Sequence, residues 1–168
     1  MPDKVLIFGD IMGRIGRQAL SELLGDLRRE HKPVLVIANG ENLAHGAGVT
    51  PKTVQEILDA GVDIITTGNH VWDNKNGKDV FRDPKLGQRI IRPANYPEGT
   101  PGKGWIIVKK GDRTFFIVNM MGRVFIHQDF DDPFRTIDHL LETECPKDAI
   151  ILVDFHAEAT SEKNTFGH

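Results

Sequence analysis

Apolar runs of strand length alternate with amphipathic segments in the first part of the chain. We interpret three of these runs as buried strands, because each is short, mainly apolar and bounded by polar or glycine-containing segments: Val5–Phe8, Val34–Ala38 and Val62–Thr66. Two helices are predicted between them. The resulting strand–helix–strand–helix–strand order predicts a parallel sheet with right-handed crossovers.

Both predicted helices have recognisable signals in the sequence. The first, Arg17–Arg29, places four leucines on one face: Leu20, Leu23, Leu24 and Leu27. The second begins with Thr50 and Pro51, a favourable pair for the N-cap and the first helical position. Gly61 suits the position just past the end of that helix.

The second part of the chain predicts a different arrangement. A short strand is expected at Arg89–Ile91, and the stretch WIIVKKGDRTFFIVNMM is typical of two antiparallel strands joined by a turn at Gly111–Asp112. Asp132 and Pro133 then begin another helix. A buried strand follows at Ile150–Phe155.

The last ten residues predict the beginning of one more helix, with Thr160 or Ser161 as its cap. The chain stops about one turn later. Because a single turn after a central strand is an unusual end for an α/β domain, we expect the chain to be shorter than its natural gene product. We therefore interpret residues 1–168 as a single domain that is incomplete at its C-terminus.

Composition excludes some classes of protein. A length of 168 residues and a hydrophobic fraction of 39 % are sufficient for one globular domain. The formal charge of −3 argues against an extended nucleic-acid surface. No apolar run approaches the ~20 residues of a membrane span, there is no signal-peptide pattern, and Cys145 is the single cysteine. We expect a soluble, cytoplasmic protein without a membrane partner, and a homo-oligomer is compatible with this composition.

Side chains that bind metals follow four of the predicted strands. GDIMG carries Asp10, NGEN carries Glu41 and Asn42, GNHVWDN carries Asn69 and His70, and DFHAE carries Asp154 and His156. Because the carboxyl ends of parallel strands lie along one edge of a sheet, we expect these side chains to meet there. Carboxylate, carboxamide and imidazole groups together suit Mn, Fe or Zn better than Ca. A cation would also offset the repulsion between the gathered carboxylates.

The glycines of GDIMGRIG raise the alternative of a phosphate-binding loop. Asp10 at the mouth of such a loop would repel phosphate, and the G-x-G-x-x-G spacing is absent. We interpret Gly9 and Gly13 instead as residues that let the backbone turn tightly around a charged ligand. Taken singly, Asp10 also fits a helix cap, Glu41 a ribose-binding acid, and His156 a core histidine.

Other polar residues are secondary candidates. His45 lies in the AHGAG loop, where it can touch a substrate. Asn119 and Arg123 follow a predicted strand and can approach the same place.

GDIMG, NGEN, GNHVWDN and DFHAEATSEK resemble motifs of the YmdB-like branch of the calcineurin-like metallophosphoesterase superfamily. The resemblance covers essentially the whole chain, and DFHAEATSEK is its most specific part. Two departures from the superfamily pattern point to this branch. Met12 stands where the Asp-x-His motif has its histidine, and Glu41 replaces the second-motif aspartate. The resemblance implies an α/β fold, a metallophosphoesterase-like β-sandwich with mixed sheets flanked by helices.

The resemblance also implies a role for each matching residue. Asp10 and Asn42 would serve a first metal, Glu41 would bridge two metals, and Asn69 and His156 would serve the second. The implied metals are two divalent or trivalent ions, Fe or Mn, with Zn as the alternative.

The implied activity is that of a di-metal phosphodiesterase acting on 2′,3′- or 3′,5′-cyclic nucleotides. His70 matches the catalytic histidine beside the metals, where in its protonated form it would stabilise phosphoryl charge or donate a proton to the departing oxygen. Family members carry a later Gly-Thr-His-Thr-His motif, which this sequence does not reach, and His168 does not match it. Two other classes stay open: a non-catalytic nucleotide-binding or regulatory module, and an inactive fragment of the enzyme.

Overall fold

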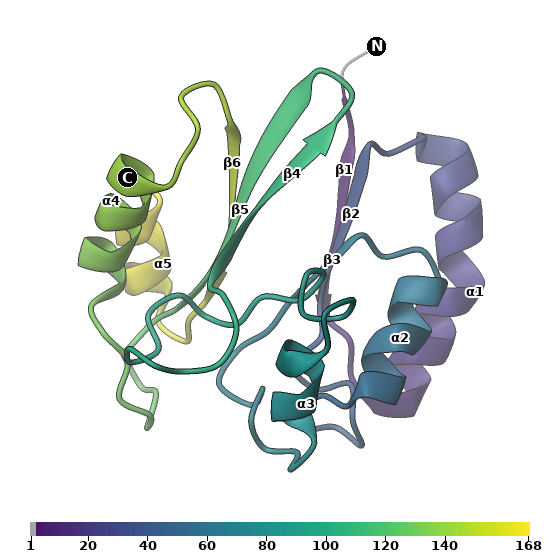
Figure 1. Ribbon diagram of the computed structural model, residues 1–168, viewed down its shortest axis with the longest axis horizontal. Helices are drawn as coiled ribbons and strands as arrows, with labels where there is room; N and C mark the ends of the chain where they lie inside the picture. Colours follow the sequence, from purple (N-terminus) through teal and green to yellow (C-terminus); the bar gives the residue numbers. More distant parts are fainter. Residues whose placement is uncertain (1–2) are drawn as a thin grey trace. The chain divides into compact units, whose positions relative to one another are not determined.

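A computed structural model describes residues 3–168 and divides the chain into two compact units, Met1–Ile91 and Arg92–His168 (Figure 1). Each unit contains one three-stranded sheet. The first sheet is parallel, and the second mixes an antiparallel pair with a parallel one. The predicted α/β class with mixed sheets and helices is confirmed. No helix of residues 3–168 is long and apolar enough to cross a membrane.

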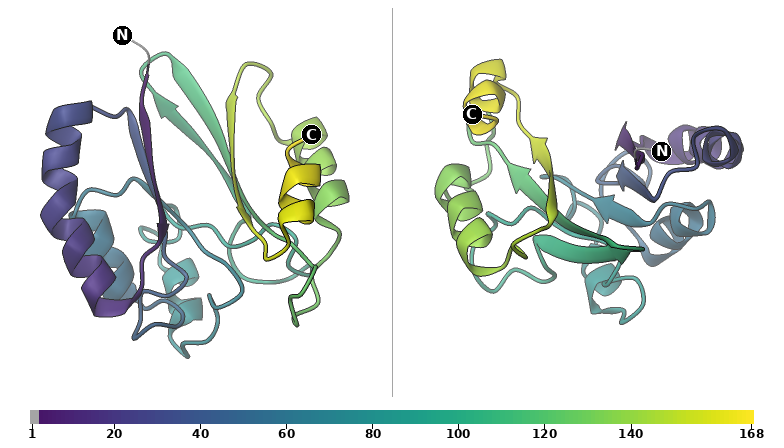
Figure 2. Two further views of the ribbon diagram at one scale, coloured as in Figure 1. Left: turned by 180° about the vertical axis from the view of Figure 1, so that it is seen from behind. Right: turned by 90° about the horizontal axis from the view of Figure 1, so that it is seen from above.

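The first unit has the predicted alternation of strands and helices. Its sheet has the order β1 (Val5–Asp10), β2 (Leu35–Asn39), β3 (Ile64–Thr66). Its helices are α1 (Gly13–His31), α2 (Pro51–Asp59) and α3 (Gly77–Arg82). Figures 1 and 2 show α1 and α2 side by side next to this sheet. The short strand expected near residue 90 is a single bridge between Ile65 and Ile90.

The boundaries of α2 follow from local chemistry. The Thr50 hydroxyl accepts the N–H of Thr53 at 3.2 Å, and the Thr53 hydroxyl accepts the N–H of Thr50 at 3.1 Å. This reciprocal capping box pairs two N–H groups that the helix itself leaves unpaired. Pro51 occupies the first helical position, and Gly61 follows the helix with φ of +115°. The predicted start and stop signals of α2 are confirmed.

Exposure in the first unit differs from the sequence prediction at two places. β1 is not a buried strand: Ile7 is 64 % exposed, whereas β2 is buried throughout. β1 lies at one edge of the sheet and β2 at its centre, but β3 at the other edge is buried, so edge position alone does not set burial. In α1 the predicted apolar face buries Leu20 and Leu24 but leaves Leu23 exposed.

The second unit contains the predicted hairpin and a parallel crossover. β4 (Trp105–Lys110) pairs antiparallel with β5 (Arg113–Met121), and β5 pairs in parallel with β6 (Ile150–His156). The helices are α4 (Pro133–Thr143) and α5 (Thr160–Phe166), which Figure 2 shows beside the sheet. Residues 116, 118 and 120 of β5 share one face and form a buried cluster with Leu140 of α4.

Two predictions for the second unit need correction. Ile150–Phe155 is not buried, because Ile150 and Ile151 are exposed on β6, which is an edge strand with β5 as its neighbour. Neither Thr160 nor Ser161 caps the last helix: Ala159 is its N-cap and provides no side-chain hydrogen bond. The predicted start of α4 is confirmed, since the carboxylate of Asp132 accepts backbone N–H groups of the first turn.

Candidate active site

Asp10 ends β1 at an irregular step of the sheet. The regular pairing with β2 continues to Phe8–Ala38 and then shifts, so that Asp10 pairs with Asn39 and Gly9 is the extra residue. A bulge of this kind bends a strand and changes the direction of the side chain beside it. The Asp10 carboxylate then accepts a hydrogen bond from the Asn42 amide, with 2.8 Å between Nδ2 and Oδ2.

The loop after β2 carries Glu41 and Asn42 in a buried position. Asn39 fixes the start of this loop: its Oδ1 accepts the N–H of Glu41 at 3.1 Å, and its Nδ2 donates to the carbonyl of Thr67 at 3.2 Å. The N–H of Gly13 donates to the carbonyl of Asn42 at 2.9 Å. Glu41 is only 2 % exposed, and a buried carboxylate is costly unless polar or positive groups accompany it.

Arg17 of α1 supports the same loop from the helix side. Its Nε donates to the carboxylate of Glu56 at 2.8 Å, and its Nη1 donates to the carbonyl of Leu43. Because Leu43 follows Asn42 directly, this contact restrains the segment that presents Glu41 and Asn42. Sequence reasoning missed this role, since an arginine on the first turns of a helix is usually a solvated residue.

His70 lies in the loop after β3, where its backbone and its ring each contact a carboxylate, those of Glu41 and Asp73. Its backbone N–H donates to Oε2 of Glu41 at 3.2 Å, and its Nδ1 lies 2.7 Å from Oδ2 of Asp73. The hydrogen bond with Asp73 raises the pKa of His70 above its ordinary value; the charges of Glu41, Asp73 and Asp10 add to the rise, and burial opposes it. The predicted residues of the first unit therefore lie within electrostatic reach of one another.

Asn69 directly precedes His70 in this loop and is half-buried. The structure thus brings together five predicted site residues that follow β1, β2 and β3: Asp10, Glu41, Asn42, Asn69 and His70. The partner of His70, Asp73, was not predicted. The spacing His-x-x-Asp at residues 70–73 is a local signal from which this contact could have been predicted.

A pocket opens beside Asp10 within the first unit. Its volume is about 730 Å³, and the residues with side chains on its wall are Asp10, Met12, Arg14, Ile15 and His45. Ligand pockets are typically ~300–1,000 Å³ and combine apolar walls with a few polar groups. Met12 and Ile15 provide exposed apolar surface, and Arg14 provides a positive charge. The structure therefore places His45 on the wall of a pocket next to a candidate metal ligand.

His156 does not share the sheet edge of the other candidates. It ends β6, where it pairs with Met121 in the sheet of the second unit. The prediction that four strands of one parallel sheet present the site is wrong, because β5, α4 and β6 form a separate crossover. Asn119 lies inside β5, fully buried, and its amide donates to the carbonyl of Asp154 at 3.3 Å.

The chemistry of the first unit's donors fits a divalent cation. Asp10 and Glu41 provide carboxylates, and Asn42 and Asn69 add carboxamide oxygens, which are donors that Mn and Fe accept. Among residues 3–168 Asp10 has no ion-pair partner, so a cation would supply the missing positive charge. No group of three or more His, Cys, Asp or Glu side chains in that range is arranged to hold a metal ion. The carboxylates and carboxamides of the first unit would therefore provide some of the ligands that a divalent cation needs.

Comparison with known proteins agrees with this arrangement. The chain is 42 % identical over 164 residues to the 2′,3′-cyclic-nucleotide 2′-phosphodiesterase of Bacillus subtilis (strain 168), covering 98 % of this chain and 61 % of that protein. The crystal structure of a hypothetical protein from Thermus thermophilus matches with a TM-score of 0.89 and 42 % identity, covering 98 % of this chain and 62 % of that one. The crystal structure of a novel phosphatase from Mycoplasma pneumoniae matches with a TM-score of 0.87 and 31 % identity, and the match covers 98 % of this chain and 58 % of that one.

The chain thus spans about three fifths of the length of these relatives. The family described as YmdB-like protein matches residues 6–168, which is nearly the whole chain. The resemblance carried by the motifs after β1, β2, β3 and β6 is thereby confirmed, and the chain belongs to the YmdB-like protein family.

Proposed function

We propose that the protein is a metal-dependent phosphodiesterase that hydrolyses 2′,3′- or 3′,5′-cyclic nucleotides. The observation that carries the proposal is the hydrogen-bonded grouping of the candidate site residues in the first unit, where the Asn42 amide donates to Asp10 and the His70 N–H donates to Glu41. The relative from Bacillus subtilis, named as a 2′,3′-cyclic-nucleotide phosphodiesterase, supports the substrate class. The product would be a nucleoside monophosphate.

The residues assigned to the metals keep the roles expected from the motifs. Asp10 and Asn42 would hold the first metal, Glu41 would bridge, and Asn69 would serve the second. His156, which the motifs also assign to the second metal, belongs to the second unit, and its role stays a prediction. When bound, two cations of Fe or Mn, with Zn as the alternative, would supply Lewis-acid charge to the phosphoryl oxygens. The buried Glu41 and the Asn42–Asp10 hydrogen bond keep these donors in fixed positions before any ligand arrives.

His70 is the proposed proton donor. Its Nδ1 is engaged by Asp73, which orients the ring and leaves Nε2 as the atom that can reach a substrate oxygen. The raised pKa favours the protonated ring, so Nε2–H can donate to the departing oxygen as its P–O bond breaks. Alternatively, the protonated ring stabilises negative charge on the phosphoryl group without transferring its proton.

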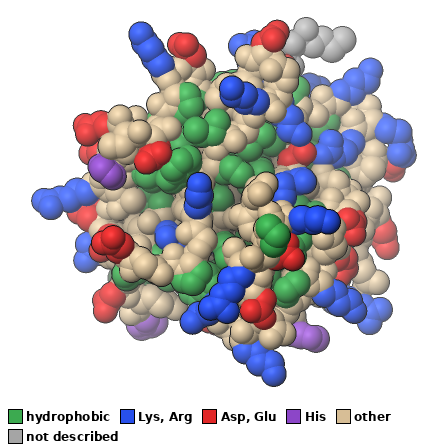
Figure 3. Space-filling view, viewed as in Figure 1, with side chains coloured by type: hydrophobic (Ala, Val, Ile, Leu, Met, Phe, Trp, Pro, Cys, Tyr) green, Lys and Arg blue, Asp and Glu red, His purple; other side chains and the backbone are tan. Residues whose placement is uncertain are grey.

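The pocket beside Asp10 is the proposed position of the nucleoside part. Met12 and Ile15 offer apolar contact to a base, and Arg14 offers a positive charge to the phosphate. Figure 3 shows positive and negative side chains interspersed on the visible face, as suits a small-molecule substrate better than an extended nucleic acid. The cytoplasmic location and the homo-oligomer stay predictions.

Hydrolysis of bis-p-nitrophenyl phosphate, with and without added Mn²⁺, tests the proposal. Wild-type protein should hydrolyse it only with the metal, and His70→Ala should lower turnover about 10²- to 10⁴-fold while bound Mn remains unchanged. His139→Ala, on the exposed side of α4, is the control. Loss of bound Mn in His70→Ala would make His70 a ligand rather than the proton donor.

The same assay, together with measurements of Mn²⁺ and NAD binding, separates the alternatives. Protein that binds Mn²⁺ without hydrolysing the diester would match the alternative of an inactive fragment of the enzyme. Protein that binds NAD but no metal would be a nucleotide-binding module. The buried position of Glu41 argues against its use as an accessible ribose-binding acid.

A further inference from the structure

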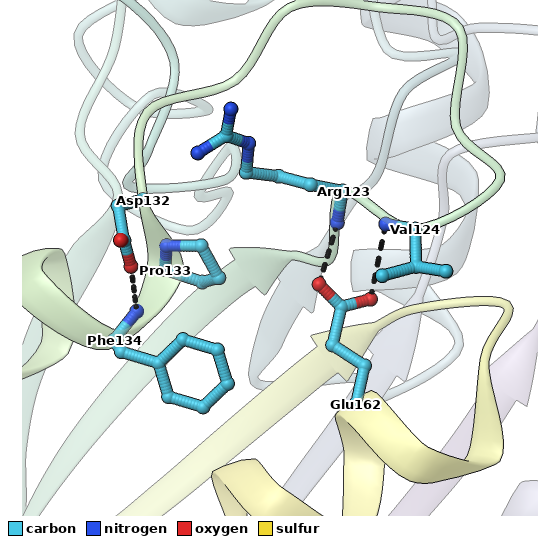
Figure 4. Close-up of a pocket in the computed structure, with 6 residues that line it drawn as sticks. All are labelled: Arg123, Val124, Asp132, Pro133, Phe134 and Glu162. Carbon is cyan, nitrogen blue, oxygen red and sulfur yellow. Dashed lines mark hydrogen bonds between the residues drawn. The ribbon is translucent and has the colours of Figure 1, made fainter.

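The second unit contains a cavity that the proposed function does not use. Its volume is about 360 Å³, and it is lined by Arg123, Val124, Asp132, Pro133, Phe134 and Glu162 (Figure 4). We call it the Arg123 pocket. All of its residues belong to the unit Arg92–His168, and its size lies at the lower end of the ~300–1,000 Å³ range of small-molecule sites.

Glu162 is buried and fixes one wall of the Arg123 pocket. Its Oε1 accepts the backbone N–H of Arg123 at 2.8 Å, and its Oε2 accepts the N–H of Val124 at 3.3 Å. The preceding Gly122 leaves no room for a side chain, since a Cβ there would lie 2.4 Å from Glu162 Oε2. Both carboxylate oxygens are therefore committed to the backbone that presents Arg123. This is a role for the DFHAEATSEK motif outside the proposed catalytic centre.

The guanidinium of Arg123 remains available for a ligand. Its side chain extends away from Glu162, toward the side of the pocket formed by Asp132 and Pro133 (Figure 4). Among residues 3–168 this guanidinium has no hydrogen-bond or ion-pair partner. Five N–H donors in a fixed plane match two oxygens of a phosphate.

The opposite wall combines apolar surface with one acceptor. Phe134 packs its ring 5.7 Å from that of Phe166 and lines the pocket with Pro133. Asp132 accepts the N–H groups of Phe134 at 2.9 Å and Arg135 at 3.3 Å, both through Oδ1. Its Oδ2 is thus left as an acceptor for a hydroxyl group.

We propose that the Arg123 pocket binds a small organic phosphate of nucleoside monophosphate size. Arg123 pairs with two phosphate oxygens, the wall of Pro133 and Phe134 contacts the base, and Asp132 accepts a ribose hydroxyl. Glu162 is a positioning residue, because it holds the backbone that directs Arg123. None of the six lining residues is an assigned metal ligand, so binding in the presence of EDTA can be tested independently of the proposed hydrolysis.

The test is a titration of the 168-residue protein with AMP in the presence of EDTA, followed by amide NMR. We expect saturable shifts at Val124 and Phe134, and Arg123→Ala should weaken the binding about tenfold or more, as loss of charge-assisted hydrogen bonds does. Arg135→Ala, an exposed arginine of α4 outside the pocket, should bind AMP as the wild type does. Inorganic phosphate should compete weakly, and adenosine should not bind.

Three results would overturn the proposal. The first is an absence of AMP binding, and the second is equal weakening by Arg123→Ala and Arg135→Ala. The third is a set of shifts confined to Gly13 and Gly46, which would place AMP in the first unit. Glu162→Gln tests the positioning role: it retains Arg123 but loses one acceptor for the backbone N–H groups of Arg123 and Val124, so the affinities for AMP and for inorganic phosphate should both fall. Unchanged AMP affinity in this variant would remove Glu162 from the proposal.

Discussion

Replacement of Gly48 by alanine tests how tightly the loop after β2 packs against the His70 loop. Gly48 has φ of +75°, a conformation that costs an L-residue about 1–2 kcal/mol. A Cβ there would also lie 2.6 Å from the backbone nitrogen of Asn74, and ordinary contact begins at 3.4 Å, so one segment must move by about 0.8 Å. Overpacking of this kind typically costs about 1–3 kcal/mol.

Gly46 provides the matched control in the same loop. Its φ is +93°, and a Cβ there would meet only the Met12 sulfur at 3.6 Å, which is an ordinary contact. Both alanine variants therefore carry the backbone cost, and only Gly48→Ala adds the clash. We expect the free energy of unfolding of Gly48→Ala to be about 1–3 kcal/mol lower than that of Gly46→Ala.

Urea unfolding followed by tryptophan fluorescence measures this difference. Trp72 reports on the first unit when Trp105 is replaced by Phe in every variant. Because Asn74 directly follows Asp73, the ring signals of His70 in the NMR spectrum should also shift in Gly48→Ala and not in Gly46→Ala. Equal destabilisation by the two variants would refute the close approach of Gly48 to Asn74.

Two further predictions concern the support of the site. Asp73→Asn should lower the pKa of His70 toward 6.5, measured by NMR on metal-free protein, because the Asp73 hydrogen bond is the largest cause of the rise. The raised pKa adds stability below pH 6.5 that is lost as the pH rises through the pKa of the folded protein, so wild type and Asp73→Asn should converge in stability at alkaline pH. Arg17→Met removes the bonds to Glu56 and Leu43 and should weaken Mn²⁺ binding in calorimetry about tenfold. Arg29→Met, on the exposed side of α1, should leave Mn²⁺ binding unchanged. Equal Mn²⁺ affinities of Arg17→Met and Arg29→Met would exclude the positioning role of Arg17.

Local chemistry predicted those parts of the fold that depend on neighbouring residues alone. The cap of α2 at Thr50 and the hairpin turn at Gly111–Asp112 are examples, because both are set by a few consecutive residues. Burial of β1 and β6 was mispredicted, since an apolar run looks alike in an edge and a central strand. The exposure of Ile7 and Ile151 depends on what packs against their face of the sheet, which the sequence of the strand does not show.

The second sheet shows a similar limit. A crossover from β5 through α4 to β6 has the same local pattern as the crossovers of the first sheet, so nothing in the sequence of β6 indicates that it joins β5. The motifs identified Asp10, Glu41 and His70 correctly as neighbours. They did not reveal the contact of Arg17 with Leu43, because it joins residues far apart in the sequence. The contact of His70 with Asp73 is local and was overlooked.

The bulge at Gly9 is the position in β1 where a residue can be lost without changing the pairing of residues 5–8 with β2. Gly9 has no partner residue in β2, so deleting it would leave the pairs from Val5–Leu35 to Phe8–Ala38 in register. A deletion within residues 5–8 would slip the residues on one side of it by one position and turn their side chains to the opposite face of the sheet. Natural variation in length would therefore be tolerated next to the carboxylate of Asp10, where it alters the aim of that side chain without unfolding the sheet.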